Sequence, residues 1–406
     1  MSVSPGELDT WEQVGNRHGP WWFRVCDKVG TPVELVKDPR SVSLTLRHGA
    51  TATGSLTLPA SHERTNDLMS DGARFSFTST LTGEVLSTGT VRGDQGQAHP
   101  DGTEGGRVGT ATWSLVDDHA VLADWNAAPA AGKTYDVVRG PAETVARTLI
   151  TRAATRLGVS LYFPASQGRG AQVVVSARWQ PLSDLLYPLI TTAGIGLHVR
   201  WDAGQARYEV TCYEPAVWLK KITAHSGVVD DWSWSRTYPG ATRVVVLGPR
   251  EGAARLIRPV IDAPLESALN AVRELVLDAR DVDDVDPAAT PARVLADVHA
   301  DMDARGLAKL DEGARTVSLQ VALAAVPEMA YGRPDGLRVG DLLKTQLVPS
   351  RPVVLVPLTA VQLSWSTESG FTVVPEVGQW QDSVLSPLVR AVSDLAVGWR
   401  RQKVSV

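Results

Sequence analysis

The fold is decided by the segment Arg139-Gly-Pro-Ala-Glu-Thr-Val-Ala-Arg-Thr-Leu-Ile-Thr-Arg-Ala-Ala-Thr-Arg-Leu-Gly158, which predicts one amphipathic helix between two long regions of β pattern. Pro141 suits the first helical position, where the N–H that proline lacks would have no intrahelical partner. Gly158 supplies a flexible stop. The apolar face has helical spacing and consists of Ala142, Val145, Ala146, Leu149, Ile150, Ala153 and Leu157.

The residues before this helix, 21–138, alternate in polarity as strands do. Val42, Leu44 and Leu46 face one way, and the residues between them are polar. Many short strands with turn residues between them indicate a β-sandwich or a small barrel. We expect the Gly-rich stretch 93–109 to be a long hairpin loop. It is a poor candidate for phosphate binding, because no helix pattern follows it.

Residues 139–214 change character and predict a compact α+β domain. A second helix follows from Pro181 and ends at Gly194, with Pro188 as a point at which it would kink. Its apolar face is predicted to hold Leu182, Leu185, Leu186, Leu189, Ile190 and Ala193. The strands of this domain are expected at 159–163, 172–177, 197–201 and 207–213.

The β pattern returns in residues 215–263 and 314–385, which we interpret as a second β domain. Its strands are expected at 232–236, 242–247, 255–261, 316–323, 343–348, 353–361 and 371–374. A small α/β insert, residues 264–313, interrupts this domain with a helix at 265–272, a strand at 274–278 and a helix from Thr290 to about Arg305 that has Pro291 in its first turn. The ends are an N-terminal arm, residues 1–20, and a C-terminal helix, residues 386–406.

The composition is that of an ordinary folded protein. Of the 406 residues, 43% are hydrophobic and 21% are charged, and the length predicts several structural units. The net charge of −5 leaves no basic footprint, which argues against a dedicated nucleic-acid-binding protein. The N-terminus has no signal pattern, and the longest apolar run, 352–361, is too short for a membrane span. We therefore expect a soluble chain, made in the cytoplasm.

Residues that could bind a metal ion are scarce. The acidic run Asp281–Asp286 is the best candidate, but a calcium loop needs Gly at its sixth and Glu at its twelfth position, which here are Asp286 and Ala292. We interpret the run as a solvated loop before a helix whose N-terminus favours acidic neighbours. Cys26 and Cys212 are expected to be buried free thiols, although a disulfide between them stays open.

Sequence signatures of catalysis are absent. None of the eight histidines forms an i, i+4 metal pair, and no Gly-x-Ser-x-Gly or Cys–His nucleophile signature occurs. Asp117-Asp118-His119 would suit part of a triad, but we interpret it as a polar β-turn between strands at Trp113 and Val121. Paired carboxylates for glycoside hydrolysis stay open, because such pairs meet in space rather than in sequence. We predict no catalytic, cofactor-binding or metal-binding residue.

The 13 tryptophans are conspicuous. Trp232 and Trp234 alternate with serines, which directs both rings to one face of a strand. One interpretation is a platform on which sugar rings stack. The other, which we favour, is packing in the core and at a subunit interface, where Trp contributes much buried area. Six tryptophans fall in or beside predicted strands: Trp21, Trp22, Trp232, Trp234, Trp365 and Trp380.

The order of these units and the sequence of the helix that follows Gly140 resemble those of the tail-hub proteins of long-tailed bacteriophages (the baseplate-hub or tail-associated lysin-like N-terminal region family). The likeness spans about residues 30–385 and rests on the order of short motifs. It implies a β-rich α+β fold in which two antiparallel β-barrel domains carry α/β inserts and three chains close into a ring. The further motifs are Trp179-Gln-Pro-Leu-Ser-Asp-Leu-Leu186 with Ala193-Gly-Ile-Gly-Leu197, Thr242–Gly248 followed by Arg258, Glu274-Leu-Val-Leu-Asp-Ala-Arg-Asp281, and Gly332–Gly340 with Asp341.

The same resemblance implies a function. The chain would be a non-enzymatic, structural minor tail protein that forms the trimeric hub of a tail tip, joins the tail tube and distal ring to that tip, and lines the DNA exit channel. Its partners would be two further copies, the distal ring protein, the tape-measure protein and tip or fibre proteins of one virion, with DNA passing without specific binding. The alternative is a receptor-binding or cell-wall-glycan-binding tail protein, and a peptidoglycan hydrolase is the weakest reading.

Overall fold

The computed structural model describes residues 21–79, 83–100, 107–131, 136–225, 229–280, 282–288, 292–312, 315–323, 337–346, 353–377 and 380–382. The predicted N-terminal arm and C-terminal helix lie outside these residues. The chain divides into two compact units. Unit 1 draws on residues 1–233 and 319–378, and unit 2 on residues 234–318 and 379–406.

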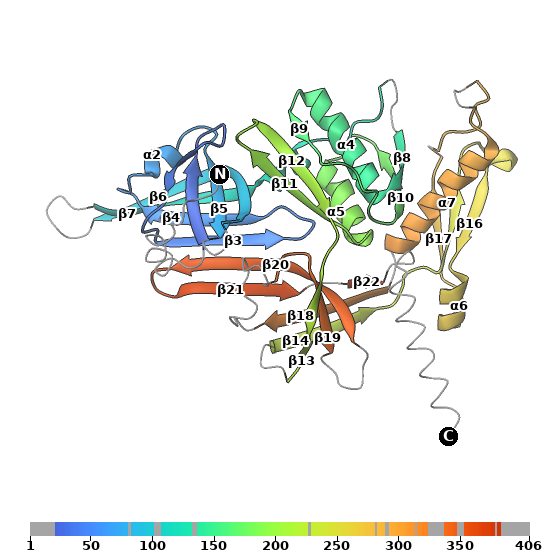
Figure 1. Cartoon of the computed structure of the whole chain (residues 1–406). Helices are drawn as coiled ribbons and strands as arrows, with labels where there is room; N and C mark the ends of the chain where they lie inside the picture. The colour runs from blue at the N-terminus through green and yellow to red at the C-terminus, as the bar shows by residue number, and fades with distance from the viewer. Residues whose placement is uncertain are drawn as a thin grey trace. The chain divides into compact units, whose positions relative to one another are not determined.

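A large antiparallel sheet forms the centre of unit 1, and it joins the two predicted β regions. Strand β20 from the second region pairs with β3 from the first, so that Leu363 lies opposite Leu44 (Figure 1). The order of neighbours is β21-β20-β3-β4-β7-β6-β5-β1-β2, and β19 pairs both with β20 and, in parallel, with β13. The strands are β1 (Trp21–Cys26), β2 (Pro32–Leu35), β3 (Ser41–Arg47), β4 (Thr53–Pro59), β5 (Arg74–Ser79), β6 (Val85–Pro100), β7 (Arg107–Asp117), β13 (Val217–Thr223), β19 (Leu342–Gln346), β20 (Val354–Ser366) and β21 (Gly370–Val377).

The predicted β-rich α+β class is confirmed, and alternation explains the sheet. In β3 the apolar residues Val42, Leu44 and Leu46 are all buried, while their neighbours are half-buried or exposed. They join one core cluster with Trp113 of β7 and Phe77 of β5. Pairing among the described strands closes no barrel. The two separate barrels and the predicted domain boundaries therefore stay proposals.

The Gly-rich stretch 93–109 is not the long loop that its composition predicts. Strand β6 continues to Pro100 and pairs with β7 residue by residue, for example Gly96 with Ala111 and Ala98 with Gly109. The two strands extend as a ribbon because each supplies the backbone hydrogen bonds of the other. A register shift between Val91 and Gly93 marks where the ribbon begins.

The two helices predicted between residues 139 and 214 are present, and this part of the chain lies within unit 1. Six of the seven residues assigned to the apolar face of helix α4 are fully buried, but Leu157 is 43% exposed in the last turn. Pro141 is the N-cap rather than the first helical residue, and Gly158 ends the helix in a left-handed conformation with φ +69°. The elements are β8 (Asp136–Pro141), α4 (Ala142–Leu157), β9 (Leu161–Tyr162), β10 (Gln172–Ala177), α5 (Leu182–Thr192), β11 (Gly196–Asp202) and β12 (Arg207–Tyr213).

Short helices complete the elements of unit 1. Helix α2 (Thr65–Leu68) lies between β4 and β5, and the 3-10 turn η1 (Asp118–Ala120) leads from β7 into α3 (Val121–Asp124). The sequence predicts a strand at Val121, and this prediction is wrong, because Val121 begins helix α3. No helix among the described residues is long and apolar enough to cross a membrane.

Unit 2 contains a three-stranded sheet in the order β16-β15-β17, with helix α7 on one face. The helix buries Val298 and Met302 in one cluster with Val244, Val246 and Val260 of the sheet. The chain passes between the units within β14 and β18, and β22 pairs with the first residues of β18. The elements are β14 (Val229–Thr237), β15 (Arg243–Leu247), η2 (Gly252–Ala254), β16 (Ile257–Ile261), α6 (Ala263–Leu269), β17 (Glu274–Asp278), α7 (Leu295–Glu312), β18 (Arg315–Leu323) and β22 (Trp380–Asp382).

The start of α7 corrects a sequence assignment. The helix was expected from Thr290, but it begins at Leu295. The backbone of Arg293 instead exchanges hydrogen bonds with Asp286, at 2.8 and 3.1 Å. The N–H of Val294 is capped by Asp297 Oδ2 at 2.9 Å, so the first-turn carboxylate sits at the observed start.

Gly306 lets α7 approach its sheet closely. A Cβ at this position would lie 2.9 Å from Val260 Cβ and 3.0 Å from Val246 Cγ2. Gly306→Ala is therefore expected to destabilise unit 2 by about 1–3 kcal/mol through overpacking, against the usual gain of about 1 kcal/mol for Ala over Gly in a helix. Thermal unfolding measures the change. The control is Ala308→Gly, on the exposed side of α7, which should lower stability only through the poor helix propensity of glycine. A Gly306→Ala variant that is more stable than the wild type would contradict the close contact between α7 and its sheet.

Candidate functional site

A cluster of buried, hydrogen-bonded polar side chains lies in unit 1, where residues 139–214 meet the large sheet. We call this cluster the polar seam. Strand β11 there contacts β6 and the turn η1. The seam consists of Arg74 on β5, Thr88 on β6, Asp117 at the end of β7, Asp118 and His119 in η1, and Trp201 on β11.

Asp118 is the centre of the seam. Its carboxylate is 2% exposed and pairs with the guanidinium of Arg74, which is 6% exposed. The Thr88 hydroxyl donates to Asp118 Oδ2 at 2.6 Å, and the Trp201 N–H donates to the same oxygen at 2.9 Å. A buried charge pair is tolerated when each member is hydrogen-bonded, and here the donors come from both the sheet and β11. The pair therefore ties the α+β domain to the sheet.

Trp201 reinforces this tie. Arg74 Cζ lies 5.0 Å from the centre of the indole ring, which places the cation over its face. The indole N–H donates to the Val29 carbonyl at 2.7 Å, in the turn between β1 and β2. Gly30 is adjacent, and a Cβ there would lie 2.7 Å from the Trp201 nitrogen, so this turn is shaped around the ring.

Asp117 and His119 satisfy backbone groups on opposite sides of η1. Asp117 Oδ1 accepts the Ala52 N–H at 3.0 Å, and burial raises the pKa of Asp117 to about 8. His119 Nε2 accepts the Val199 N–H of β11 at 3.2 Å, so the neutral ring carries its proton on Nδ1. Burial lowers the pKa of His119 to about 3, because the charged imidazolium would lose its hydration.

Strands β11 and β12 form a hairpin, and a second contact attaches its other end, at Tyr213, to His48 and Val339. The Tyr213 hydroxyl of β12 lies 3.1 Å from His48 Nδ1 and donates to the Val339 carbonyl at 3.3 Å. The His198 ring stacks on Tyr213 with ring centres 4.5 Å apart. Gly340 has φ +97°, and a Cβ there would lie 2.7 Å from both the His48 and Tyr213 polar atoms. Glycine at this turn is therefore required by the contact.

The Asp117-Asp118-His119 segment does not form a β-turn between two strands, because Asp118 and His119 lie in the 3-10 turn η1 that leads into helix α3. All three residues are buried, and the structure corrects the expectation of a β-turn between two strands. The carboxylates face Ala52 N and Arg74, and His119 faces β11, so their partners are structural. The arrangement holds two layers together and presents no activated nucleophile among the contacts described.

The cysteines are free thiols, as predicted: Cys26 is buried and Cys212 half-buried. Burial raises the pKa of each thiol to about 11, which keeps both protonated and weakly nucleophilic. In the part of the chain that the structure describes, no group of three or more His, Cys, Asp or Glu side chains could hold a metal ion.

The acidic run is a braced loop in its described part, residues 282–288. Arg250 donates to both carboxylate oxygens of Asp284, at 2.7 and 2.9 Å. Asp286 Oδ1 caps the N–H of Ala288 at 3.0 Å. Asp281 lies outside the described residues. In this described part, the carboxylates of Asp284 and Asp286 are therefore used in an ion pair and a backbone cap.

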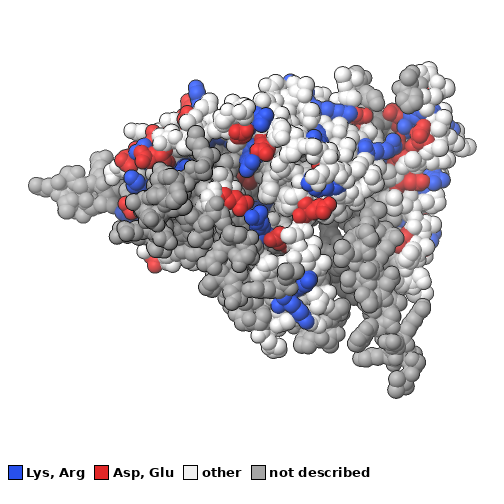
Figure 2. Space-filling view, in the orientation of Figure 1, with Lys and Arg blue, Asp and Glu red and all other residues white. Residues whose placement is uncertain are grey.

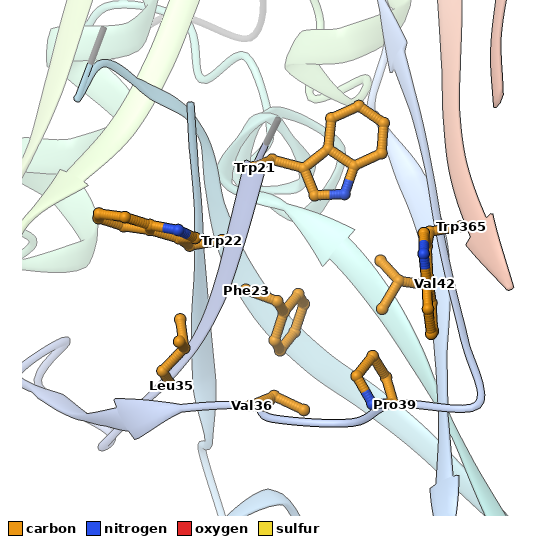
Figure 3. A pocket seen from close by; sticks show the side chains of 8 residues that line it. All are labelled: Trp21, Trp22, Phe23, Leu35, Val36, Pro39, Val42 and Trp365. Carbon is orange, nitrogen blue, oxygen red and sulfur yellow. The ribbon is translucent and has the colours of Figure 1, made fainter. Parts of the chain in front are cut away.

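Trp21, Trp22 and Trp365 belong to the core of unit 1, with exposures of 4%, 5% and 8%. Figure 3 shows Trp22 on one side of β1 and Trp21 with Phe23 on the other, as strand alternation requires. They line a small pocket of about 30 Å³. These rings therefore offer no platform for a sugar. The side chains of Trp232, Trp234 and Trp380 lie outside the described set.

Charge on the visible surface is mixed. Figure 2 shows Lys and Arg side chains interspersed with Asp and Glu over this face. Ion pairs occur among the described residues, for example between Arg200 and Glu209 at 2.7 Å and between Arg258 and Asp303 at 2.6 Å. This face therefore presents no continuous basic stripe of the kind that binds nucleic acid.

Comparison with known proteins agrees with this architecture. The family model of siphovirus ReqiPepy6 Gp37-like proteins matches residues 22–379. Comparison with curated proteins finds no significant sequence match. The fold resembles the 43 kDa tail protein of prophage MuSo2 from Shewanella oneidensis, with 13% identity, TM-score 0.50, and coverage of 88% of this chain and 97% of the other. It also resembles prophage tail protein gp18 from Listeria monocytogenes EGD-e, with 11% identity, TM-score 0.51, and coverage of 92% and 98%.

Proposed function

The chain belongs to the siphovirus ReqiPepy6 Gp37-like protein family, and from that premise we propose that it is a structural minor tail protein that forms a trimeric hub at the tip of a phage tail. In this role the hub joins the tail tube and its distal ring to the tip and surrounds the DNA exit channel. The role is mechanical, with no catalytic step.

The observation that carries this proposal is the arrangement of the whole chain. One large sheet unites both β regions, a separate α/β unit interrupts the second region, and the family match extends over nearly all of this framework. Two solved tail proteins share the fold along almost their full lengths. The likeness therefore extends over the whole framework of the chain, which suits a structural subunit of a ring better than a protein whose function lies in one small binding or catalytic site.

The finer domain plan is part of the proposal. We place a first hub domain at 21–138, an inserted domain at 139–214, a second hub domain at 215–263 with 314–385, and a small insert at 264–313. Edge strands such as β2 have one unpaired side among the described strands. In an assembled ring, neighbouring subunits would cover such edges and complete the two barrel-like layers.

The polar seam is consistent with a subunit that transmits force. Asp118 links Arg74 of the sheet to the Trp201 backbone of β11, and Tyr213 ties β12 to the turn at Gly340. Buried polar contacts need particular partners in particular places, so they hold the inserted domain in one orientation. A hub that transmits force between the tail tube and the tip requires this kind of fixed geometry.

The alternative of a glycan-binding tail protein has weaker support. Three of the six tryptophans that suggested it, Trp21, Trp22 and Trp365, are buried in the core. Stacking on a sugar needs an accessible aromatic face, and these rings have none. Binding to peptidoglycan fragments or surface glycans would restore this alternative.

The proposal is tested by the mass of the assembly. We expect three chain masses by analytical ultracentrifugation at micromolar concentration, and negative-stain images of the same sample with threefold rings. The ring requires large buried seams, so the trimer should persist on dilution to the nanomolar range. A chain that stays monomeric at tens of micromolar, alone and with the distal ring protein of the same phage, would overturn the trimeric hub.

A further inference from the structure

One exposed aromatic residue of unit 1 is held in a strained conformation. Trp179, in the turn before α5, is 53% exposed and has φ +66°, in the left-handed region that bulky residues avoid. Both sides of the turn are fixed: the Trp179 N–H donates to the Ala127 carbonyl at 2.9 Å, and the Ala127 N–H donates to the Gln180 carbonyl at 2.8 Å. The turn therefore keeps a costly conformation that directs a large apolar ring outward.

The neighbours of Trp179 make a small basic and apolar surface. Arg156 Cζ lies 5.3 Å from the centre of the Trp179 ring. Leu157, next to it in the last turn of α4, is 43% exposed. We call Trp179, Arg156 and Leu157 the Trp179 patch. Trp and Arg are the residue types that most often dominate binding energy at protein interfaces, and an Arg that already stacks on the ring loses little freedom on binding.

Unit 2 carries a surface of the opposite charge. The described part of the acidic loop, residues 282–288, exposes Val285 at 39% and the carboxylate of Asp283. Val294 and Leu295, at the start of α7, are 52% and 42% exposed. Asp284 is already paired with Arg250, so Asp283 is the acidic side chain of this surface that can face Arg156, and Val285, Val294 and Leu295 are the apolar ones that can face Trp179.

The acidic loop is braced by a residue with a strained backbone. Arg250, which binds both oxygens of Asp284, has φ +73°, again in the left-handed region. The backbone pairing of Asp286 with Arg293 fixes the other end of the loop. The Trp179 turn and the braced acidic loop are two different surfaces of one chain, which is what a head-to-tail contact uses, since each copy then presents a different surface to each neighbour.

We propose that the Trp179 patch of one copy binds the acidic loop of a second copy, with Trp179 seated against Val285 and Leu295, and Arg156 facing Asp283. This contact rests on the proposed hub function and names the surfaces that join neighbouring subunits. A heterologous contact of this type closes into a ring when its rotation permits, which is what a trimer requires.

Substitutions at Trp179 separate binding from folding. Trp179→Gly removes the aromatic ring and also relieves the strained φ, because glycine adopts this region freely. We expect the thermal midpoint to stay level or rise, while the subunit dissociation constant increases at least tenfold. The two readouts are thermal unfolding and sedimentation equilibrium of the full chain. Tyr162→Ala is the matched control, since Tyr162 is 39% exposed on the same domain with an Arg207 guanidinium over its ring, at 4.3 Å.

Charge reversal tests the partner surface. Arg156→Glu and Asp283→Arg should each weaken assembly at least tenfold, and the double variant should recover most of the trimer, because the opposite charges then face each other again. Recovery in the double variant is not expected from independent folding defects.

The outcomes distinguish this contact from the hub itself. A wild-type trimer that persists unchanged in Trp179→Gly and Arg156→Glu would overturn the contact and leave the trimeric hub intact. A wild-type chain that stays monomeric would overturn both. Assembly that weakens in each single variant but does not recover in the double variant would also contradict the pairing of Arg156 with Asp283.

Discussion

Asp118→Asn is expected to destabilise unit 1 by about 3–5 kcal/mol, because it leaves the buried Arg74 guanidinium without its counter-charge. Both side chains are less than a tenth exposed, so water cannot replace the carboxylate. Asparagine keeps nearly the same shape and can still accept from Thr88 or the Trp201 N–H, so the loss measures charge rather than a cavity. Guanidinium-induced unfolding, followed by tryptophan fluorescence, measures the difference.

The matched control is a second Arg–Asp pair, which links β6 to helix α3. Arg92 donates to both oxygens of Asp124, but both side chains are nearly half exposed. Asp124→Asn should therefore cost less than about 1 kcal/mol. Equal losses at Asp118 and Asp124 would contradict the central place of Asp118. Adding Arg74→Met to Asp118→Asn should recover part of the stability, since the unpaired charge is then removed.

The sequence predicted the local elements well where periodicity was strong. In α4 the stripe from Ala142 to Ala153 is wholly buried, and Gly158 ends the helix as expected. Strand β17 has the predicted bounds, Glu274–Asp278. The errors fall at the ends: Leu157 extends past the surface that α4 packs against, and Arg293 pairs with Asp286 instead of entering α7. Local patterns determine an element, but tertiary contacts decide its last turn.

The sheet and the seam could not be predicted in this way. The pairing of β20 with β3 joins residues about 320 apart in sequence, and no local signal carries it. Asp117-Asp118-His119 was interpreted as a polar β-turn between two strands, because Asp residues are common in turns. A signal was available: the segment lies between Trp113 and Leu122, both fully buried, with no Gly or Pro to form a turn. Polar residues flanked closely by core residues on both sides point to a buried network.

The exposed Trp179 illustrates a different limit. Its motif carried the family resemblance, but the sequence does not show that its backbone is left-handed or that its ring faces outward. The turn is held by two backbone hydrogen bonds to Ala127, which lies about 50 residues earlier in the chain. Strain of this kind is visible only in the folded structure, and it is the strained residues that point to the contact between copies.

His119 should make unit 1 sensitive to acid. In the native state its pKa is about 3, while in the unfolded chain it has the ordinary value near 6.5. Below about pH 6.5 the unfolded chain therefore binds a proton that the native state does not, and stability falls as pH decreases, by about 1.4 kcal/mol per unit until the native pKa is reached. Asp117, whose native pKa of about 8 lies above its unfolded value, acts in the opposite sense, because the native state takes up its proton first.

Comparison with His119→Gln isolates the histidine. Glutamine can accept the Val199 N–H from a similar position and does not titrate, and both proteins keep Asp117, so its contribution cancels. We expect wild type to lose about 2–3 kcal/mol relative to His119→Gln between pH 7 and pH 4.5, measured by guanidinium unfolding at each pH. His225→Gln, at an exposed position of unit 1, controls for removing an imidazole from the unfolded chain. If wild type and His119→Gln lost stability in parallel on acidification, His119 would not be the buried neutral acceptor that holds β11 to the turn after β7.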